Sequence, residues 1–456
     1  MRRRPARIPS GAFWSGAAGG WNRRVTEGEA VLSRHVQLRR TLAAPLRVGF
    51  VSSFPPRRCG IASFTADLAA AIRQANPAVR IAVVAVDPGW ERWERKPPYP
   101  AGVDEVFAIE AEQREQYWQA AEWLARWGCQ VVSVQHEYGL FGGVRGSYIL
   151  DLVEALRVPV VSTLHTVLRF PDPQQRDVLA RLAARSRWVV AQARSAVELL
   201  VRVYGVDPGR MVVIPHGTPV FAPRSRERAR AALEVEPDRP VLLTYGLIGP
   251  GKGIEQALAA VREVARRHPR VLYLVAGQTH PNVRRSMGEA YREHLQNLVL
   301  DLGLQHHVRF IDRYLDLEEL GLLLAAADVY VTPYPNLEQV VSGTLSYALA
   351  AGKAVVSTPF RYAREVLGPG RGLLCQAGDP SSMAREILRV LDSPELRRSL
   401  EHRAWSFGQS LRWELVGVRY MRLLQWVAQE AASDSPARRW AGVALAGTAA
   451  SWSAGT

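Results

Sequence analysis

Short apolar runs alternate with amphipathic stretches along most of the chain. In the first half, several runs rich in valine and isoleucine are continuously apolar, which is typical of strands buried on both faces of a parallel sheet. Amphipathic stretches such as YWQAAEWLARWG lie between them and predict helices. The predicted strands of this first series are 46–52, 80–86, 130–135, 158–164, 188–193 and 211–215.

The alternation of strand and helix is interrupted at residues 216–240, which are rich in proline and charged residues, as expected of an interdomain connection. The second series of predicted strands is 241–246, 271–277, 307–311, 328–334, 354–358 and 372–376. The repeat predicts an α/β protein with two Rossmann-like, doubly wound parallel-sheet domains. Ligands bind such sheets at the carboxyl ends of the strands, so we expect a ligand cleft between the two facing domains.

Neither end of the chain has a periodic apolar face, and this sets the outer boundaries. The expected segments are a basic arm at 1–44, a first domain at 45–217, a linker at 218–240, a second domain at 241–409 and a disordered tail at 429–456. The arm holds nine arginines and two glutamates. This composition predicts either a disordered segment or the product of a start codon placed too early. It lacks the apolar region of a secretory signal, and no nucleic-acid-binding motif follows it, so we expect no specific nucleic-acid partner.

The charge of the chain draws attention to its lysines. The 456 residues include 58 basic and 43 acidic side chains, for a net charge of +15. Only three of the basic residues are lysines, at Lys96, Lys252 and Lys353. A lysine ammonium is a compact point charge, and a site close to a phosphate is one place where it differs from arginine. Lys252 is therefore a candidate phosphate ligand; the alternative is a solvated turn lysine, which is our interpretation of Lys353.

Cysteine usage and hydropathy bear on the compartment. The three cysteines are far apart and form no C-x-x-C pair, which argues against a disulfide framework or a zinc site and fits a reducing cytosol. No apolar run reaches the roughly 18 residues of a membrane span. We therefore expect a cytoplasmic protein without a transmembrane segment, and a peripheral membrane contact stays open.

The stretch YGLIGPGKGIEQAL is one residue short of a nucleotide-triphosphatase P-loop. Gly253 stands where that motif needs a serine or threonine hydroxyl for Mg²⁺, and no convincing Walker-B aspartate accompanies it. The residues instead predict a glycine-rich turn at a helix N-terminus with Lys252 beside it. Backbone N–H groups, the helix dipole and an ammonium together make a suitable cradle for a diphosphate.

Five motifs, in this order, resemble those of GT-B glycosyltransferases of the family 4 type over about residues 46–428. The motifs are PPRRCGIASFTADLAAAI, VVSTLHTV, VIPHGTP, YGLIGPGKGIEQAL and LAAADVYVTPYPNLEQVVSGTLSYALAAGKAVVST. The resemblance implies a retaining enzyme that moves a sugar from a nucleotide-diphosphate sugar to a carbohydrate or small-molecule acceptor. It also implies that a last helix at 410–428 packs back on the first domain. No D-x-D motif is present, so we expect no metal and no other cofactor.

Three residues of the first domain are candidates for the site, two of them through the resemblance and His136 through its place at a strand end. Gly60 lies in a glycine loop that lets the backbone approach the ligand. His165 ends a predicted strand at the edge of the cleft and would hydrogen-bond the transferred sugar, or else be satisfied within its loop. His136, followed by Glu137, ends another strand, and an acceptor contact and a structural role are both open.

In the second domain the resemblance points to the donor. Lys252 would neutralise the diphosphate and stabilise the leaving nucleotide diphosphate. Ser342, Gly343 and Thr344 open a predicted helix whose amides and hydroxyls would bind the same diphosphate. The alternative for Ser342 is an ordinary helix N-cap, and the two roles are compatible.

The sequence departs from the family pattern around the donor. Leu247 stands where the family usually has arginine, and Gln339 and Tyr347 stand at the positions of its two usual glutamates. Glu338 is one residue out of register but is the only carboxylate in the loop, so it is our candidate for stabilising positive charge at the anomeric carbon, with Gln339 as the alternative sugar contact. Tyr347 would bind the ribose or belong to the core.

These departures leave two classes of function. The first is a metal-independent glycosyltransferase. The second is a GT-B body with weak or no catalysis that binds a nucleotide sugar. A GT-B epimerase or phosphorylase fits the order and content of the motifs less well.

Overall fold

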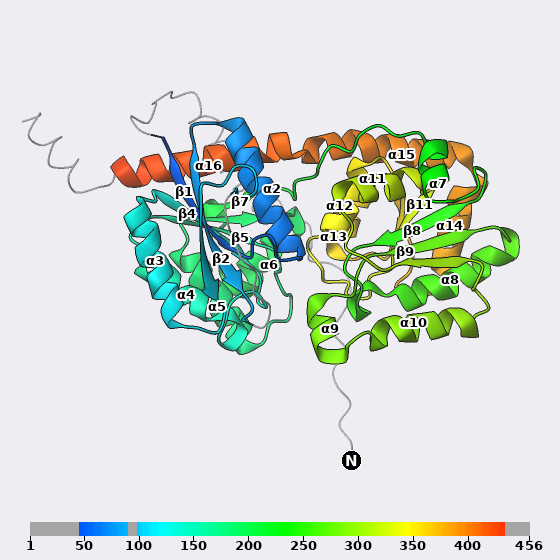
Figure 1. The fold of residues 1–456 in the computed structure, drawn as a ribbon, viewed down its shortest axis with the longest axis horizontal. Coiled ribbons are helices and arrows are strands. Elements are labelled where there is room, and N and C mark those ends of the chain that lie inside the picture. Colours follow the sequence, from blue (N-terminus) through cyan, green and yellow to red (C-terminus); the bar gives the residue numbers. More distant parts are fainter. Residues whose placement is uncertain (1–44, 90–97, 434–456) are drawn as a thin grey trace, which may run out of the picture.

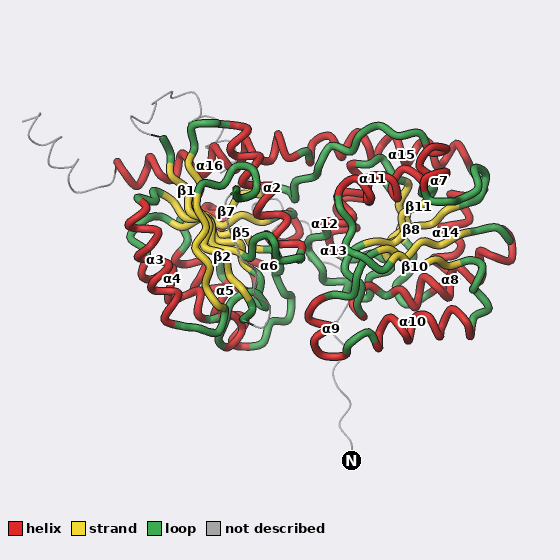
Figure 2. Tube along the Cα trace, viewed as in Figure 1, coloured by secondary structure: helices red, strands yellow, loops and turns green. Residues whose placement is uncertain are grey.

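Two α/β lobes make up the computed structural model, which describes residues 45–89 and 98–433. Each lobe is built on a parallel sheet with helices on both faces (Figure 1 and Figure 2). The strand order is β3-β2-β1-β4-β5-β6-β7 in the first sheet and β10-β9-β8-β11-β12-β13 in the second. In each sheet the chain starts inside and winds outward in both directions, so the predicted pair of doubly wound sheets is confirmed.

The first lobe contains the seven-stranded sheet. Its strands are β1 (Arg47–Ser52), β2 (Arg80–Asp87), β3 (Glu105–Glu110), β4 (Val131–His136), β5 (Val160–Leu164), β6 (Trp188–Ala191) and β7 (Met211–Val213). Its helices are α2 (Gly60–Ala75), α3 (Glu115–Trp127), α4 (Tyr148–Ala155), α5 (Pro173–Arg185) and α6 (Arg194–Tyr204), with the 3-10 turns η1 (Val144–Gly146) and η2 (Pro208–Arg210).

The second lobe contains the six-stranded sheet. Its strands are β8 (Val241–Tyr245), β9 (Leu272–Ala276), β10 (Val308–Ile311), β11 (Val329–Thr332), β12 (Ala354–Ser357) and β13 (Leu373–Leu374). Its helices are α7 (Arg226–Ala232), α8 (Ile254–Arg267), α9 (Pro281–Met287), α10 (Ala290–Asp301), α11 (Leu317–Ala326), α12 (Gly343–Ala350), α13 (Arg361–Leu367), α14 (Pro380–Asp392) and α15 (Pro394–Gly408), with η3 (Pro250–Lys252) and η4 (Gln409–Leu411). In the described part of the chain, every helix is too short or too polar to cross a membrane.

Strand β3 is missing from the sequence-based prediction. It lies at the edge of the first sheet and pairs with β2. Ile109 is its one fully buried residue, and the others are exposed or partly exposed. A criterion based on continuously apolar runs finds strands covered on both faces, so it passes over an edge strand of mixed polarity.

Helix α16 (Trp413–Ser433) returns from the second lobe and packs on the first beside α2 (Figure 1). Val416, Tyr420 and Leu424 are buried in the same core as β1 and α2. A Cβ at Gly417 would lie 2.6 Å from the Cβ of Ala71, so glycine permits this close crossing. The helix continues beyond the predicted residue 428, and the first residues of the predicted tail are helical. The predicted arm and the rest of the tail lie outside the described residues.

The chain crosses between the lobes twice, and the two crossings are hydrogen-bonded to each other. The N–H of Thr218 donates to the carbonyl of Leu411 at 2.8 Å, and the N–H of Trp413 donates to the carbonyl of Thr218 at 3.0 Å. A Cβ at Gly217 would lie 2.2 Å from the Trp413 ring, so this crossing needs glycine. The two segments therefore form one compact connection between the lobes.

The predicted linker 218–240 contains helix α7, which is tied to the second lobe by a buried ion pair. Arg230 donates to Asp328 at 2.7 Å, and both side chains are buried. Lys353 lies beside this pair and donates to the carbonyl of Ala327 at 3.2 Å. It is 7% exposed, and burial lowers its pKa to about 8. The prediction of a solvated turn lysine is thus wrong, because the turn after α12 folds against this cluster.

Candidate functional site

The loop between β8 and α8 has the geometry of a phosphate cradle. Gly246 and Gly253 have φ angles of 123° and 64°, in the region that favours glycine. A Cβ at Gly253 would lie 2.1 Å from the carbonyl oxygen of Pro333, so the loop packs directly on the segment that follows β11. This packing sets Lys252 against that segment, where its Nζ donates to the Tyr334 hydroxyl at 2.9 Å.

The N-terminus of α12 completes the cradle. Ser342 is its N-cap, and its Oγ accepts the N–H of Leu345 at 3.3 Å. Thr344 Oγ1 lies 2.8 Å from the Tyr334 hydroxyl and 3.2 Å from Ser342 Oγ. A continuous set of polar groups therefore joins Lys252 to the positive end of a helix, as a diphosphate site requires.

Tyr334 is the link in this set. Burial raises the pKa of its phenol, but the Lys252 ammonium and the hydrogen bonds from Thr344 and Ser342 outweigh burial and hold the pKa below its ordinary value. The Lys252 Nζ also lies 4.7 Å from the centre of the Tyr334 ring. Tyr334 thus holds the ammonium in place at the helix N-terminus.

His165 follows β5 and has both ring nitrogens engaged. Its Nε2 lies 3.0 Å from Oε1 of Gln135, and its Nδ1 lies 3.4 Å from Nε2 of Gln192. Burial, with His216 and His136 nearby, lowers its pKa to about 3. The ring is therefore neutral at physiological pH, with Nε2 donating to Gln135 and Nδ1 accepting from Gln192. A sugar contact through either nitrogen would have to replace one of these bonds.

His136 lies at the end of β4 and is fully buried. Its ring packs against Tyr138 and Phe141, and burial lowers its pKa to about 4. Neither ring nitrogen has a hydrogen-bond partner in the described part of the chain. Glu137 beside it accepts from the Thr166 hydroxyl at 2.5 Å. This position places the imidazole behind the cleft surface and gives the predicted acceptor contact no support.

Glu338 joins the two lobes. Its Oε2 lies 2.6 Å from Nε of Arg361, and its Oε1 lies 3.1 Å from Arg169 of the first lobe. Burial acts to raise its pKa, but the hydrogen bonds to Arg361 and Arg169 outweigh burial and lower it. Glu338 is therefore an anion at neutral pH, and its charge is compensated by two guanidinium groups.

A cavity of about 340 Å³ lies beside this contact, between the lobes. Gln339 lines it, and its Nε2 donates to the carbonyl of Val341 at 2.7 Å. The lining residues are His165, Thr166, Val167, Leu168, Arg169, Phe170, Asn336, Glu338, Gln339, Val340 and Val341. The structure thus brings His165, Glu338 and Gln339 to one cavity, which is large enough for a sugar ring.

Tyr347 lies one turn into α12 and faces the first lobe. Its ring meets that of His216 edge-on at 6.0 Å, and a Cβ at Gly343, the first residue of the helix, would lie 3.0 Å from His216 Nε2. Across from it is Asp67 of α2. Burial raises the pKa of Asp67 to about 6, although the nearby Trp413 and Tyr347 side chains lower it. Tyr347 therefore belongs to the packing between the lobes.

Gly60 is the first residue of α2, after the N-cap Cys59. Apart from its chain neighbours and the backbone of its own helix, no atom of the described residues lies within 4 Å of a Cβ built on Gly60, so this side of the helix start borders open space. One turn further, Ser63 Oγ lies 3.1 Å from the hydroxyl of Tyr314 in the second lobe. The start of α2 therefore faces the donor side of the cleft.

Several residues of this region were not singled out from the sequence. They are Asp67, Gln135, Arg169, Gln192, Tyr334 and Arg361. Gln135 and Gln192 lie at the end of β4 and just past the end of β6, so a search of every predicted strand end would have found them. Arg169 and Arg361 carry no such signal, since only the fold brings them to Glu338.

Two family models match the chain, one in each lobe. The model described as Glycosyltransferase Family 4 matches residues 59–221, and the model described as Glycosyl transferases group 1 matches residues 225–406. The D-inositol 3-phosphate glycosyltransferase 2 of Catenulispora acidiphila is 28% identical over 323 residues, which cover 65% of this chain and 70% of that protein.

Solved structures share the two-lobed fold. The sucrose-phosphate synthase of Thermosynechococcus elongatus superimposes with a TM-score of 0.69 at 20% identity and covers 84% of this chain and 99% of its own. Anabaena Alr3699/HepE in complex with UDP-glucose gives 0.66 at 16% identity and covers 85% and 100%. Together with the family models on both lobes, these similarities show that the chain belongs to the GT-B glycosyltransferases of the family 4 type, which transfer a sugar from a nucleotide sugar to an acceptor.

Proposed function

We propose that the diphosphate of the donor binds between Lys252 and the N-terminus of α12. The observation that carries this proposal is the set of polar contacts from Lys252 through Tyr334 to Thr344. During transfer the bond from the anomeric carbon to the diphosphate breaks, and negative charge grows on the departing oxygen. An ammonium and helix N–H groups aimed at that oxygen stabilise the charge, so the reaction needs no metal ion.

The transferred sugar then occupies the cavity of about 340 Å³ between the lobes. Glu338 is the anion of that cavity, and it favours the positive charge that grows at the anomeric carbon. Arg169 and Arg361 reduce this effect while they are paired with it, so full stabilisation requires one of these contacts to loosen. The sugar is transferred with retention of configuration, as the family resemblance implies.

In this proposal His165 shapes the sugar cavity and takes no part in proton transfer. Its lowered pKa, about 3, leaves the ring neutral at neutral pH, so it cannot serve as a general acid, and its one N–H is bonded to Gln135. Two glutamines fix its ring, so it offers a rigid wall to the sugar. The acceptor is a carbohydrate or polyol hydroxyl compound, and D-inositol 3-phosphate is the first to try because the sequence relatives are named for it.

Release of nucleoside diphosphate tests the proposal. Purified protein is incubated with UDP-glucose, UDP-N-acetylglucosamine, GDP-mannose and ADP-glucose, each with D-inositol 3-phosphate or with a panel of mono- and disaccharides. We expect acceptor-dependent release from one donor, and we expect Lys252→Ala to abolish most of it. Release that is unchanged in Lys252→Ala would contradict the assignment of the phosphate site.

A nucleotide-sugar-binding protein without turnover is the second candidate. The observation in its favour is that Gln339 and Tyr347 replace the usual glutamates, and that Tyr347 is packed between the lobes. Binding measured by calorimetry without diphosphate release for any donor and acceptor pair would support this candidate over the enzyme.

We also infer a cytoplasmic location. Cys59, Cys129 and Cys375 are free thiols, as is usual in a reducing compartment. Separation of cytosol from membranes would test this, and recovery with the membranes would indicate a peripheral contact instead.

A further inference from the structure

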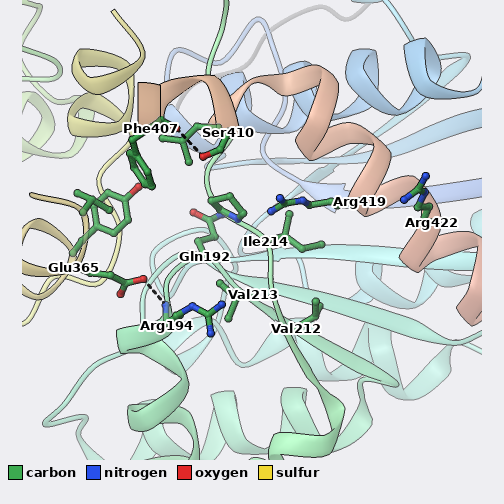
Figure 3. Close-up of a pocket in the computed structure, with 14 residues that line it drawn as sticks. Gln192, Arg194, Val212, Val213, Ile214, Glu365, Phe407, Ser410, Arg419 and Arg422 are labelled. Atoms are coloured by element: carbon green, nitrogen blue, oxygen red, sulfur yellow. Dashed lines mark hydrogen bonds between the residues drawn. The ribbon is translucent and has the colours of Figure 1, made fainter. Parts of the chain in front are cut away.

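A second cavity, of about 450 Å³, lies where the chain crosses between the lobes (Figure 3). Strand β7 and the segment after it form one wall, α13 of the second lobe forms another, and α16 forms the third. The lining residues are Gln192, Arg194, Val212, Val213, Ile214, Pro215, Tyr362, Glu365, Val366, Phe407, Ser410, Leu411, Arg419 and Arg422. None of them lines the cavity beside His165, so the two cavities are distinct.

The charge of this cavity is positive. Glu365 is its one acidic lining residue, and both oxygens are engaged, since they accept the N–H groups of Arg194 and Ser195 at 2.9 Å each. Arg419 and Arg422 are exposed side chains of α16, and neither forms an ion pair with a described residue. Two guanidinium groups are therefore available to an anion.

Gln192 adds a second requirement on the ligand. It is 1% exposed, and its Oε1 has no hydrogen-bond partner among the described residues. A buried amide oxygen without a partner is costly, and it can be satisfied only by a donor. A phosphate is an acceptor, so the donor has to be another group of the ligand, such as a hydroxyl.

We propose that this cavity binds a phosphorylated sugar or polyol. Its phosphate pairs with Arg419, whose side chain extends toward Gln192 (Figure 3), while Arg422 farther along α16 adds positive charge, and a hydroxyl of the ligand's ring donates to Gln192. Val213 and Ile214 offer apolar surface to the C–H groups of the ring. The volume lies within the range of roughly 300–1,000 Å³ that small-molecule sites occupy. The inference goes beyond the proposed transfer reaction, since the site lies outside the donor cavity.

The position of the cavity couples it to transfer. Its walls come from both lobes, so a bound ligand favours the arrangement of the lobes seen in the structure. Gln192 also touches His165 Nδ1 through its Nε2, at 3.4 Å. A ligand that holds the amide of Gln192 therefore holds the wall of the sugar cavity as well, and it acts as an effector of the enzyme.

Calorimetric titration tests the site. The probes are glucose 6-phosphate and myo-inositol 1-phosphate, with glucose, myo-inositol and inorganic phosphate as partial ligands. We expect at least one phosphorylated probe to bind the wild-type chain, and the partial ligands to bind at least tenfold more weakly. The double variant R419Q/R422Q should weaken that probe at least tenfold. Arg398→Gln is the matched control, because Arg398 is an exposed arginine of α15 outside the cavity.

Each other result would overturn the proposal. Failure of both phosphorylated probes to bind excludes the proposed site. Equal affinity for a phosphorylated probe and for inorganic phosphate excludes a site that binds the phosphate and a hydroxyl at the same time. Binding that survives R419Q/R422Q but is lost in Arg169→Gln places the ligand in the cavity beside His165. Both arginines are exposed, so the double variant should keep the melting temperature of the wild type. If its melting temperature falls, Arg419→Gln alone replaces it, with the expected loss reduced to severalfold.

Discussion

Removal of the Lys252 ammonium tests the phosphate site most directly. Among the described residues this ammonium has one side-chain hydrogen bond, to Tyr334, and it lies beside the N-terminus of α12. Lys252→Ala deletes the charge but leaves the helix N-terminus and its cap Ser342 intact. The variant should therefore fold normally and lose stabilisation of the leaving diphosphate.

The expected loss of kcat can be estimated from the one interaction that the substitution removes. The ammonium supplies one interaction of the kind that is worth about 2.7–4 kcal/mol at a developing anion, which corresponds to about 10²–10³ in kcat. Tyr334→Phe is the matched variant, because it removes the anchor and keeps the charge. A hydrogen bond to a charged group contributes about 1.5–3 kcal/mol, so its loss should lower kcat by about 10- to 150-fold.

The assay follows nucleoside diphosphate release under saturating donor, with donor affinity measured separately by calorimetry. Lys252→Arg should restore little activity, because a planar guanidinium does not fit a site built for a point charge. Turnover of Lys252→Ala within a few fold of wild type would refute the reasoning. A larger loss in Tyr334→Phe than in Lys252→Ala would also refute it, and it would assign the main role to the phenol.

Four further outcomes are expected. Transfer should persist in excess EDTA, and a loss that Mn²⁺ or Mg²⁺ restores would reveal a required cation. Glu338→Gln should lower kcat more than tenfold while Gln339→Ala has a mild effect, and the reverse order would assign the sugar contact to Gln339. A chain cut to 45–433 should keep its melting temperature, whereas a chain ending before Trp413 should not fold, because α16 fills the core of the first lobe. Burial raises the pKa of Asp67 from 3.8 to about 6 in the folded state, so the folded state binds this proton more tightly than the unfolded one. The free energy of unfolding should therefore fall by up to about 3 kcal/mol between pH 4 and pH 6, and a denaturation series in which Asp67→Asn shows the same pH dependence as wild type would contradict this.

The sequence was sufficient to predict the strands in the interior of both sheets. Runs such as RIAVVAV and VLYLVAG are apolar without interruption, and this pattern has few solutions other than a strand covered on both faces. The sequence pattern was insufficient for elements that are partly buried or rich in charged residues. Strand β3 is an edge strand, and α7 lies in a segment of high charge whose Arg230 is buried in an ion pair with Asp328. Pairing of this kind depends on tertiary structure and leaves no local pattern.

The residues of the candidate site also divide into those with a local sequence pattern and those that only tertiary structure brings together. Lys252, Ser342 and Thr344 were identified because each lies in a local pattern, which is a glycine-rich turn before α8 for Lys252 and the N-terminus of α12 for Ser342 and Thr344. The structure brings them together through Tyr334, which was not anticipated. Glu338 was chosen as the only carboxylate of its loop, but its contact with Arg169 spans 169 positions of the chain. The loop sequence alone could not predict that two arginines compensate the charge of Glu338.

The order of the strands is the information that the sequence lacked. Gln135, His165 and Gln192 each lie at or just past the end of a strand, and β4, β5 and β6 are neighbours in the sheet. Once that order is known, the three side chains must meet at one edge, because parallel strands end on the same side. Gln135 and Gln192 then set the tautomer of His165 from opposite sides. Because Gln192 also lines the cavity at the crossing of the lobes, the same topology that builds the cavity beside His165 connects it to the second cavity.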